Sequence, residues 1–231
     1  MKSTLTPADL EALRHIDACT LANAIETFSV RLRDEGFADS SVRCLFPKLN
    51  AMVGYAVTVK IHGANPPVGA RNYIERSDWW NFLLTIPSPR VVVVEDASSR
   101  PGLGGLLGEV HVSILRALGC VGAVTNGAVR DLPSVENMGF PLFAGNVSVS
   151  HSYVHIVEIG RTIVVGGMKV APGDLLHGDV HGVQNVPIGL ATRLPAAAAK
   201  ISAVDQALVA ICRSADFSVA KLRGAISASQ S

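Results

Sequence analysis

Residues 102–131 read GLGGLLGEVHVSILRALGCVGAVTNGAVRD, and this stretch decides both the expected fold and the expected site. A glycine-rich turn leads to an acid, Glu109, then to an expected helix, an apolar strand and the pair Arg130 and Asp131. Bare backbone N–H groups at such a turn can hold an anion where a helix begins. Carboxylates can hold a hard divalent cation, and arginine can clamp a carboxylate through two parallel hydrogen bonds. Together these parts suit chemistry on a small 2-oxo acid chelated to a metal.

The sequence on either side of this stretch predicts a parallel α/β unit. RVVVVED, at residues 90–96, is a short apolar run typical of a strand buried on both faces. We expect a helix over 105–118, a strand over 121–125 and a short helix after Asp131. This strand–helix–strand–helix alternation is typical of parallel strands with crossover helices.

The rest of the chain predicts two N-terminal helices, a β-rich second half and a C-terminal helix. Thr6, followed by Pro7 and Asp9, predicts the N-cap of a helix that runs to residue 16. Thr20 predicts the N-cap of a second helix that runs to residue 28. Further expected elements are a strand over 55–61, a helix over 72–86 with both tryptophans, strands near 154–158, 162–165 and 175–178, and a helix over 195–212. The tail after Ser214 is weakly specified. We expect one domain over residues 1–231, with the N-terminal helices in its first thirty residues.

Composition restricts the partners and the compartment. The 231 residues are 48% hydrophobic and 17% charged, with a formal net charge of +1 and no dense basic patch, so we expect no direct nucleic-acid partner. The chain starts with an amphipathic segment, so we expect no signal peptide and no membrane span. Four scattered cysteines favour reduced thiols in a cytoplasmic protein; they are Cys19, Cys44, Cys120 and Cys212.

The spacing of the acid and the Arg-Asp pair is similar to that of a known family. Glu109, twenty intervening residues and then Arg130 and Asp131 resemble the RraA-like family, which includes metal-dependent 4-hydroxy-4-methyl-2-oxoglutarate aldolases. FPLFAGN at 140–146 and GGMKVAPGDLLHGDVHGVQNVP at 166–187 extend the resemblance to roughly residues 17–195. The aldolases usually carry Asp where this chain has Glu109.

The resemblance implies a fold, a reaction and an assembly. The fold would be an α/β swivelling β/β/α sandwich, assembled as homotrimers or homohexamers. The reaction would be cleavage of a small 2-oxo diacid, of the 4-hydroxy-4-methyl-2-oxoglutarate or oxaloacetate type, with release of pyruvate. The cofactor would be a divalent cation, Mg²⁺ or Mn²⁺.

The resemblance also implies roles for particular residues. Asp131 would bind the metal directly, and Arg130 would bind the substrate carboxylate and steady the enolate charge. Glu109 would hold the metal through a water molecule and position it for proton transfer. The amides of Val110 and His111, which follow Gly108, would receive a substrate carboxylate.

Each of these residues also has a structural interpretation. Asp131 precedes Leu-Pro-Ser-Val and could be a helix N-cap. Arg130 could be a solvated side chain at a strand end. The Glu109 carboxylate would be favoured at the start of a helix whatever its function. The glycines do not form a dinucleotide-binding pattern, because Leu107 stands at the last glycine position.

Other residues leave further alternatives open. His177, Asp179 and His181 would share one face of a strand and are a weaker candidate metal site, with scaffolding as the alternative. His151 and His155 are expected on the surface or in the core, and Trp79 and Trp80 in the core or as interface anchors. The alternative function is that of a non-catalytic RraA-type regulator that binds a ribonuclease.

Overall fold

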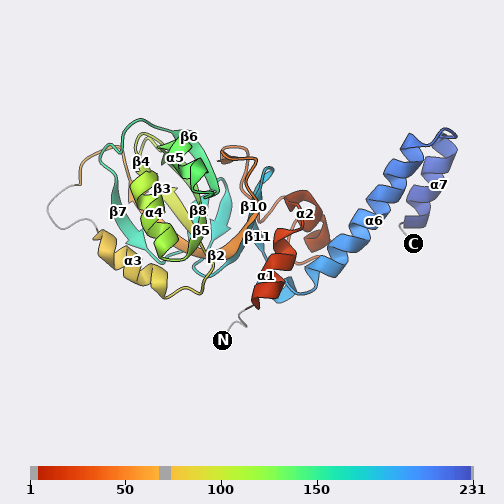
Figure 1. Ribbon diagram of the computed structural model, residues 1–231, viewed down its shortest axis with the longest axis horizontal. Coiled ribbons are helices and arrows are strands. Elements are labelled where there is room, and N and C mark those ends of the chain that lie inside the picture. Colours follow the sequence, from red (N-terminus) through yellow and green to blue (C-terminus); the bar gives the residue numbers. More distant parts are fainter. Residues whose placement is uncertain (1–4, 68–73, 230–231) are drawn as a thin grey trace.

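A computed structural model describes residues 5–67 and 74–229, and its body is built around one mixed sheet (Figure 1). The order of the sheet is β1-β6-β5-β3-β2-β10-β11, with β4 beside β5 and β7 beside β2. Its strands are β1 (Arg43–Cys44), β2 (Met52–His62), β3 (Arg90–Asp96), β4 (Gly105–Leu107), β5 (Cys120–Val129), β6 (Leu142–Val147), β7 (His155–Ile159), β10 (Leu175–Asp179) and β11 (Gly182–Val186).

The centre of the sheet is parallel, as the sequence predicts. β2 pairs with β3, β3 with β5 and β5 with β6, all in parallel. β3 has the predicted bounds, and its four valines are almost wholly buried. Val92 and Val94 belong to one hydrophobic cluster, and Val91 and Val93 to another. Successive side chains therefore fill cores on opposite faces of the sheet.

Different elements cover the two faces. Helices α3 (Arg76–Leu84), α4 (Glu109–Ala117) and α5 (Leu132–Asn137) contribute buried side chains to the first cluster, among them Trp79, Leu115 and Val135. The hairpin of β8 (Ile163–Val165) and β9 (Met168–Val170) covers the other face. The mixed α/β class is confirmed, and the helix, sheet and hairpin layers agree with a β/β/α sandwich.

A third core joins the two ends of the chain. Helices α1 (Pro7–Arg14), α2 (Ala18–Glu26) and α6 (Leu194–Arg213) pack together beside β10. A short 3₁₀ turn, η1 (Ile188–Leu190), precedes α6 in the chain. The predicted cap of α1 is confirmed, because the Thr6 hydroxyl accepts from the Asp9 N–H and the Asp9 carboxylate accepts from the Thr6 N–H. α2 is capped by Asp17 and not by Thr20; the Asp17 carboxylate accepts from the Thr20 N–H at 2.9 Å.

Some elements differ from the sequence-based expectation. The helix expected over 105–118 begins only at Glu109, because residues 105–107 pair with β5 as the short strand β4. The helix expected over 72–86 spans Arg76–Leu84, and residues 72–73 lie outside the described part. The weakly specified tail forms α7 (Val219–Ser229). Trp79 is wholly buried within the chain, so its expected role as an interface anchor is wrong.

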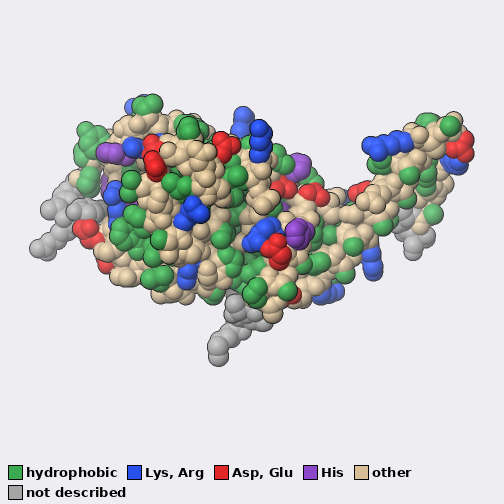
Figure 2. Space-filling model, viewed as in Figure 1, with side chains coloured by type: hydrophobic (Ala, Val, Ile, Leu, Met, Phe, Trp, Pro, Cys, Tyr) green, Lys and Arg blue, Asp and Glu red, His purple; other side chains and the backbone are tan. Residues whose placement is uncertain are grey.

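Helices α6 and α7 extend from the body as an arm, and hydrophobic side chains are visible along it (Figures 1 and 2). α7 packs on α6. An 18-residue window of α6 has a mean hydropathy of 1.4 and is only 11% buried. Among the helices of the described residues, α6 alone is long and apolar enough to cross a membrane by length and composition, a test that globular proteins also meet.

Candidate active site

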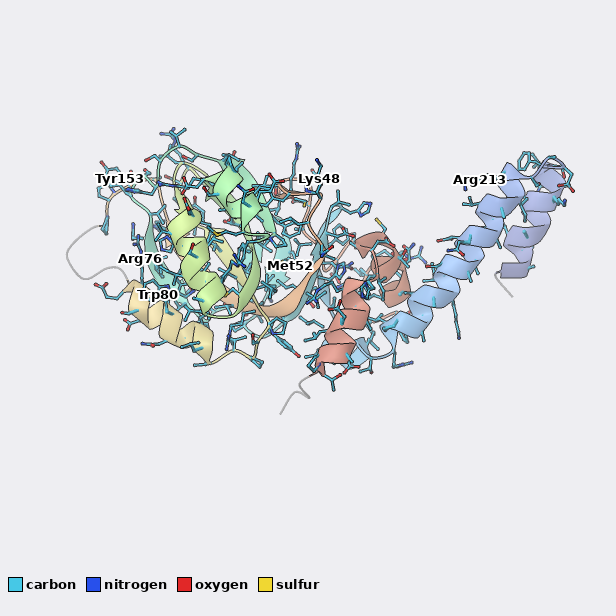
Figure 3. The ribbon with its side chains drawn as sticks, in the orientation of Figure 1. Lys48, Met52, Arg76, Trp80, Tyr153 and Arg213 are labelled. Carbon is cyan, nitrogen blue, oxygen red and sulfur yellow. The ribbon has the colours of Figure 1, made fainter. Side chains whose placement is uncertain are left out.

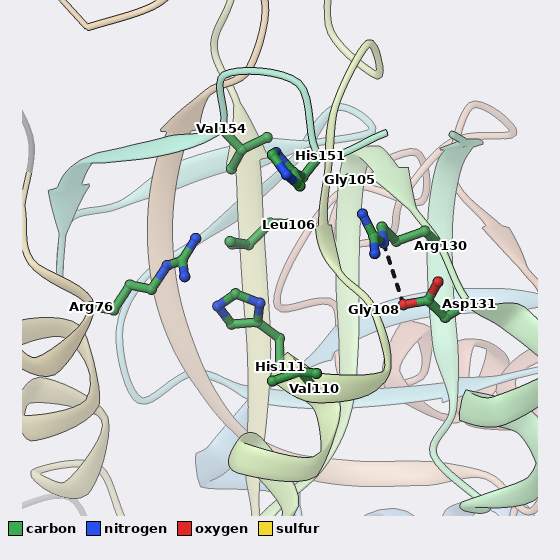
Figure 4. Close-up of a pocket in the computed structure, with 10 residues that line it drawn as sticks. All are labelled: Arg76, Gly105, Leu106, Gly108, Val110, His111, Arg130, Asp131, His151 and Val154. Atoms are coloured by element: carbon green, nitrogen blue, oxygen red, sulfur yellow. Dashed lines mark hydrogen bonds and ion pairs between the residues drawn. The ribbon is translucent and has the colours of Figure 1, made fainter. Parts of the chain in front are cut away.

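A cavity of about 280 Å³ lies where α4 begins, beside the end of β5 (Figure 4). Of the residues predicted for the site, Gly108, Val110, His111, Arg130 and Asp131 all line it. The side chain of Glu109 is exposed and is not among the residues that line the cavity. The other lining residues are Arg76, Gly105, Leu106, His151 and Val154.

Asp131 stabilises α4 and not its own helix. It precedes α5 but makes no side-chain cap there, and its backbone is left-handed, with φ 56° and ψ 38°. Its Oδ2 atom instead accepts from the Glu109 N–H at 3.0 Å and lies 3.3 Å from Nε of Arg130. Left-handed backbone at a non-glycine residue costs about 1–3 kcal/mol and is concentrated at functional sites. The structural alternative for Asp131, a side-chain cap of α5, is therefore wrong, although the carboxylate does cap the neighbouring helix α4.

Gly108 allows the start of α4 to approach the Arg-Asp pair. A Cβ atom at this position would lie 2.5 Å from Oδ2 of Asp131 and 2.9 Å from Cγ of Arg130. No larger residue fits without moving both side chains. The Glu109 N–H donates to Asp131, whereas the next two N–H groups, of Val110 and His111, have no backbone acceptor among the described residues. These two N–H groups, at the positive end of the α4 dipole, can receive an anion.

Arg130 is held by its backbone and directs its guanidinium into the cavity. Its N–H donates to the Leu107 carbonyl at 2.9 Å, which fixes the end of β5 against β4. Nε contacts Asp131, and the side chain is about one third exposed. Among the described residues, no hydrogen bond involves its two Nη groups. They can therefore form the planar fork that binds a carboxylate.

His111 is neutral in this environment. Burial, and then the charges of Arg76 and Arg130, lower the pKa of His111 to about 4. Its Nε2 atom is buried without a hydrogen-bond partner in the described part of the chain. The imidazole therefore offers hydrogen bonding to a ligand without adding a positive charge near neutral pH.

A buried aspartate shapes the glycine-rich loop that leads to α4. The Asp96 carboxylate, at the end of β3, accepts from the N–H groups of Ser98 and Gly102 at 3.1 and 2.8 Å, and from the Ser98 hydroxyl. Gly104 lies against the segment that follows β6, since a Cβ there would lie 2.5 Å from the His151 carbonyl. Asp96 and Gly104 thus bring the loop and His151 to the same cavity.

Sequence reasoning did not find Arg76 and placed His151 outside the site. Arg76 is the first residue of α3, and His151 lies in the segment between β6 and β7. Neither belongs to a local motif with the Arg-Asp pair. α3 packs on β7, and the loop before β7 lies against Gly104. These tertiary contacts bring Arg76 and His151 to the cavity, so no local signal was available.

The second candidate metal site is occupied by structural hydrogen bonds. Nε2 of the buried His177 lies 2.9 Å from the Ile16 carbonyl oxygen. The Asp179 carboxylate accepts from the N–H groups of Ala18 and His181, both at 2.8 Å. These contacts join β10 to the N-terminal helices. No group of three His, Cys, Asp or Glu side chains that could hold a metal occurs among residues 5–67 and 74–229.

The residues around Asp131 fit an oxygen-loving cation better than zinc. No hydrogen bond to Oδ1 of Asp131 is found within the described residues, whereas Oδ2 is engaged. Mg²⁺ typically keeps several waters and binds proteins through one or two carboxylates together with substrate oxygens. Structural zinc needs about four protein ligands, and catalytic zinc about three. A single carboxylate beside a cavity therefore suits Mg²⁺ or Mn²⁺.

Comparisons with known proteins identify the family of the chain. A model of the RraA-like family, described as aldolase/RraA, matches residues 18–184. A protein of Halalkalibacterium halodurans, provisionally named 4-hydroxy-4-methyl-2-oxoglutarate aldolase, is 32% identical over 121 residues, which cover 52% of this chain and 57% of that protein. This chain thus spans little more than half the length of that relative.

Solved structures with low sequence identity share the fold. An uncharacterised protein from Pseudomonas syringae pv. tomato has a TM-score of 0.74 at 22% identity, with 96% of each chain covered. RraAS2 of Streptomyces coelicolor, described as an unusual member of the RNase ES inhibitor RraA protein family, has a TM-score of 0.70 at 20% identity, with 88% of this chain and 96% of that chain covered.

Proposed function

Because this chain belongs to the RraA-like family, which includes aldolases, we propose that it is a metal-dependent carbon–carbon lyase that releases pyruvate from a small 2-oxo diacid. Substrates of the 4-hydroxy-4-methyl-2-oxoglutarate or oxaloacetate type fit this chemistry. One observation carries the proposal. The Asp131 carboxylate, the Arg130 guanidinium and the free amides at the start of α4 converge on one cavity.

Asp131 is the residue that would hold the cation, Mg²⁺ or Mn²⁺. When bound, such a cation polarises the 2-oxo oxygen and offsets negative charge. The rest of the site binds and orients the substrate. Arg130 binds the carboxylate next to the 2-oxo group, and the N–H groups of Val110 and His111 donate to the same carboxylate.

Arg130 also stabilises the reaction as the bond breaks. Negative charge develops on the pyruvate unit during C–C cleavage, and the guanidinium lies in position before the charge appears. Asp131 positions this group through its contact with Nε. Loss of carbon dioxide from oxaloacetate produces the same pyruvate enolate, so both activities can share one site.

Glu109 is the proposed group for proton transfer in the aldol cleavage. The departing fragment leaves as a carbonyl compound, so its hydroxyl proton must be accepted. Glu109 lies between Gly108 and Val110, which both line the cavity. Its exposed side chain is free of hydrogen bonds to other described side chains, so it can reorient when substrate binds.

Pyruvate release tests the proposal. Purified protein is incubated with 4-hydroxy-4-methyl-2-oxoglutarate or oxaloacetate, with added Mg²⁺ or with a chelator, and pyruvate is measured by coupling to lactate dehydrogenase. We expect release above the uncatalysed rate only with the cation. Equal rates with and without chelator would contradict the metal role. No release from any 2-oxo acid would favour the RraA-type regulator that binds a ribonuclease.

We further propose that the chain is a cytoplasmic homo-oligomer, a trimer or hexamer, without nucleic-acid or membrane partners. The arm exposes apolar side chains that a second copy would cover, among them Val204, Val209, Phe217 and Val219. A bilayer is a poorer partner for α6, because Lys200 and Asp205 lie inside the helix and each costs about 2.5–3.5 kcal/mol at a bilayer centre. Light scattering should give a multiple of 24.2 kDa, and a single-chain mass would contradict the assembly.

A further inference from the structure

The cavity contains a second arginine that the proposed reaction does not use. Arg76 stands at the start of α3 and points into the cavity from the side opposite Arg130, with His111 between them (Figure 4). Arg76 also lines an adjoining cavity of about 690 Å³, which shares Leu106, His151 and Val154 with the first. The guanidinium therefore lies at the junction of the two cavities.

The charge of Arg76 is not neutralised within the described part of the chain. No ion pair or hydrogen bond of its guanidinium is found there, although Glu75 precedes it and lines the adjoining cavity. Among residues 5–67 and 74–229, Asp131 is the only acid that lines the first cavity, and its Oδ2 is already engaged by Arg130 and the Glu109 N–H. The cavity thus has positive charge at both sides and one carboxylate.

We propose that Arg76 is a specificity-determining residue that binds the distal carboxylate of the substrate. This inference rests on the proposed function and adds how the site would distinguish diacids from monoacids. Arg130 would bind the carboxylate beside the 2-oxo group, and Arg76 the carboxylate at the other end. Arginine can hold each group with two parallel hydrogen bonds. The preferred substrates are then short 2-oxo diacids, and 2-oxo acids with one carboxylate are poor substrates.

The lining of the adjoining cavity suggests the competing hypothesis, in which the distal group of the substrate is apolar. Trp80, Ile74 and Ile156 line it and offer an apolar surface that an uncharged distal group could use. Arg76 and Trp80 lie together on α3, at the end of the body away from the arm (Figure 3). The position of the guanidinium at the entrance to this surface favours the charged group. A preference of the wild type for an apolar 2-oxo acid would overturn the inference.

A pair of substrates that differ in the distal carboxylate tests the role of Arg76. Pyruvate release is measured from 4-hydroxy-4-methyl-2-oxoglutarate and from 4-hydroxy-2-oxopentanoate, which lacks that carboxylate. We expect Arg76→Gln to lower kcat/KM for the diacid at least about tenfold, the scale of a lost charge-assisted hydrogen bond, and to leave the monoacid nearly unchanged. Arg76→Lys should recover part of the loss. Arg116→Gln is the matched control. Arg116 is exposed in the last turn of α4, and its substitution removes the same charge away from the cavity.

Binding of unreactive analogues separates this inference from the proposed reaction. Calorimetry with Mg²⁺ present compares 2-oxoglutarate with 2-oxopentanoate on the wild type and on Arg76→Gln. We expect the wild type to bind the diacid more tightly and the variant to lose that preference. Equal losses for both analogues and both substrates, or no loss for either, would overturn the role of Arg76. Selective binding of 2-oxoglutarate by a wild type that releases no pyruvate would contradict the lyase activity and still support Arg76 as a dicarboxylate ligand.

Discussion

Replacing Asp131 by asparagine should abolish turnover while the fold is kept. Asparagine tolerates left-handed backbone, so φ 56° remains accessible, and its carbonyl oxygen can still accept from the Glu109 N–H at 3.0 Å. The helix loses only the charge of its acceptor, which is worth about 0.3–1 kcal/mol at a helix N-terminus. The amide oxygen is a much weaker ligand for a hard cation than the carboxylate. Activity and stability should therefore separate in this variant.

Alanine at the same position should affect both properties. It removes the acceptor for the Glu109 N–H, at about 1 kcal/mol, and alanine adopts left-handed backbone less readily than aspartate, at about 1 kcal/mol more. We expect Asp131→Ala to lower the free energy of unfolding by about 2 kcal/mol, and Asp131→Gly by less, because glycine accepts this backbone.

Urea unfolding followed by tryptophan fluorescence measures the stability, and cation-dependent pyruvate release measures the activity. Turnover should fall by at least about a hundredfold in Asp131→Asn, as for the loss of a preorganised electrostatic group. Turnover that survives in Asp131→Asn would refute the metal role. If Asp131→Asn is instead as unstable as Asp131→Ala, the carboxylate acts mainly in stabilising α4.

Four further changes test the neighbouring residues. Arg130→Ala should lower kcat/KM by at least roughly a hundredfold, and Arg130→Lys should recover little, because an ammonium cannot copy the planar fork; steady-state kinetics decide this. Glu109→Asp should keep aldol cleavage, whereas Glu109→Ala should slow it more than oxaloacetate decarboxylation, which needs no proton acceptor. Gly108→Ala should impair turnover because its Cβ would lie 2.5 Å from Oδ2 of Asp131, whereas Gly189→Ala, where nothing lies within 4 Å, should be silent in the same assay. The pKa of His111 is about 4 in the folded protein against an ordinary 6.5, so the unfolded state binds the proton first as the pH falls. The free energy of unfolding should therefore be highest above pH 6.5 and should fall by up to about 3 kcal/mol as the pH is lowered to 4. His111→Gln should lack that loss when urea unfolding is compared at pH 7.5 and 4.5.

The sequence predicted the parts of the fold that depend on local pattern. The bounds of β3 follow from a run of four valines, and the capping box of α1 follows from Thr6 and Asp9. The nearness of the Arg-Asp pair to the start of α4 follows from the strand–helix–strand order and the spacing of the motif. These features need only short-range information.

The remaining features depend on tertiary contacts that no local pattern records. Gly105 begins a strand because β5 offers it a partner, although the sequence also fits a helix there. The Asp131 carboxylate caps α4 and not α5 because its left-handed backbone turns it toward the neighbouring helix. Arg76 reaches the cavity through the packing of α3, which buries Trp79 beneath it.

A crystal structure of the protein soaked with Mn²⁺ and oxalate tests the central claim most directly. Oxalate copies the two oxygens of pyruvate that would face the cation, and Mn²⁺ is located by its anomalous signal. We predict one strong peak about 2.1 Å from Oδ1 of Asp131, with oxalate bound between Arg130 and the amides at the start of α4. A cation bound elsewhere, or oxalate that does not contact Arg130, would contradict the account.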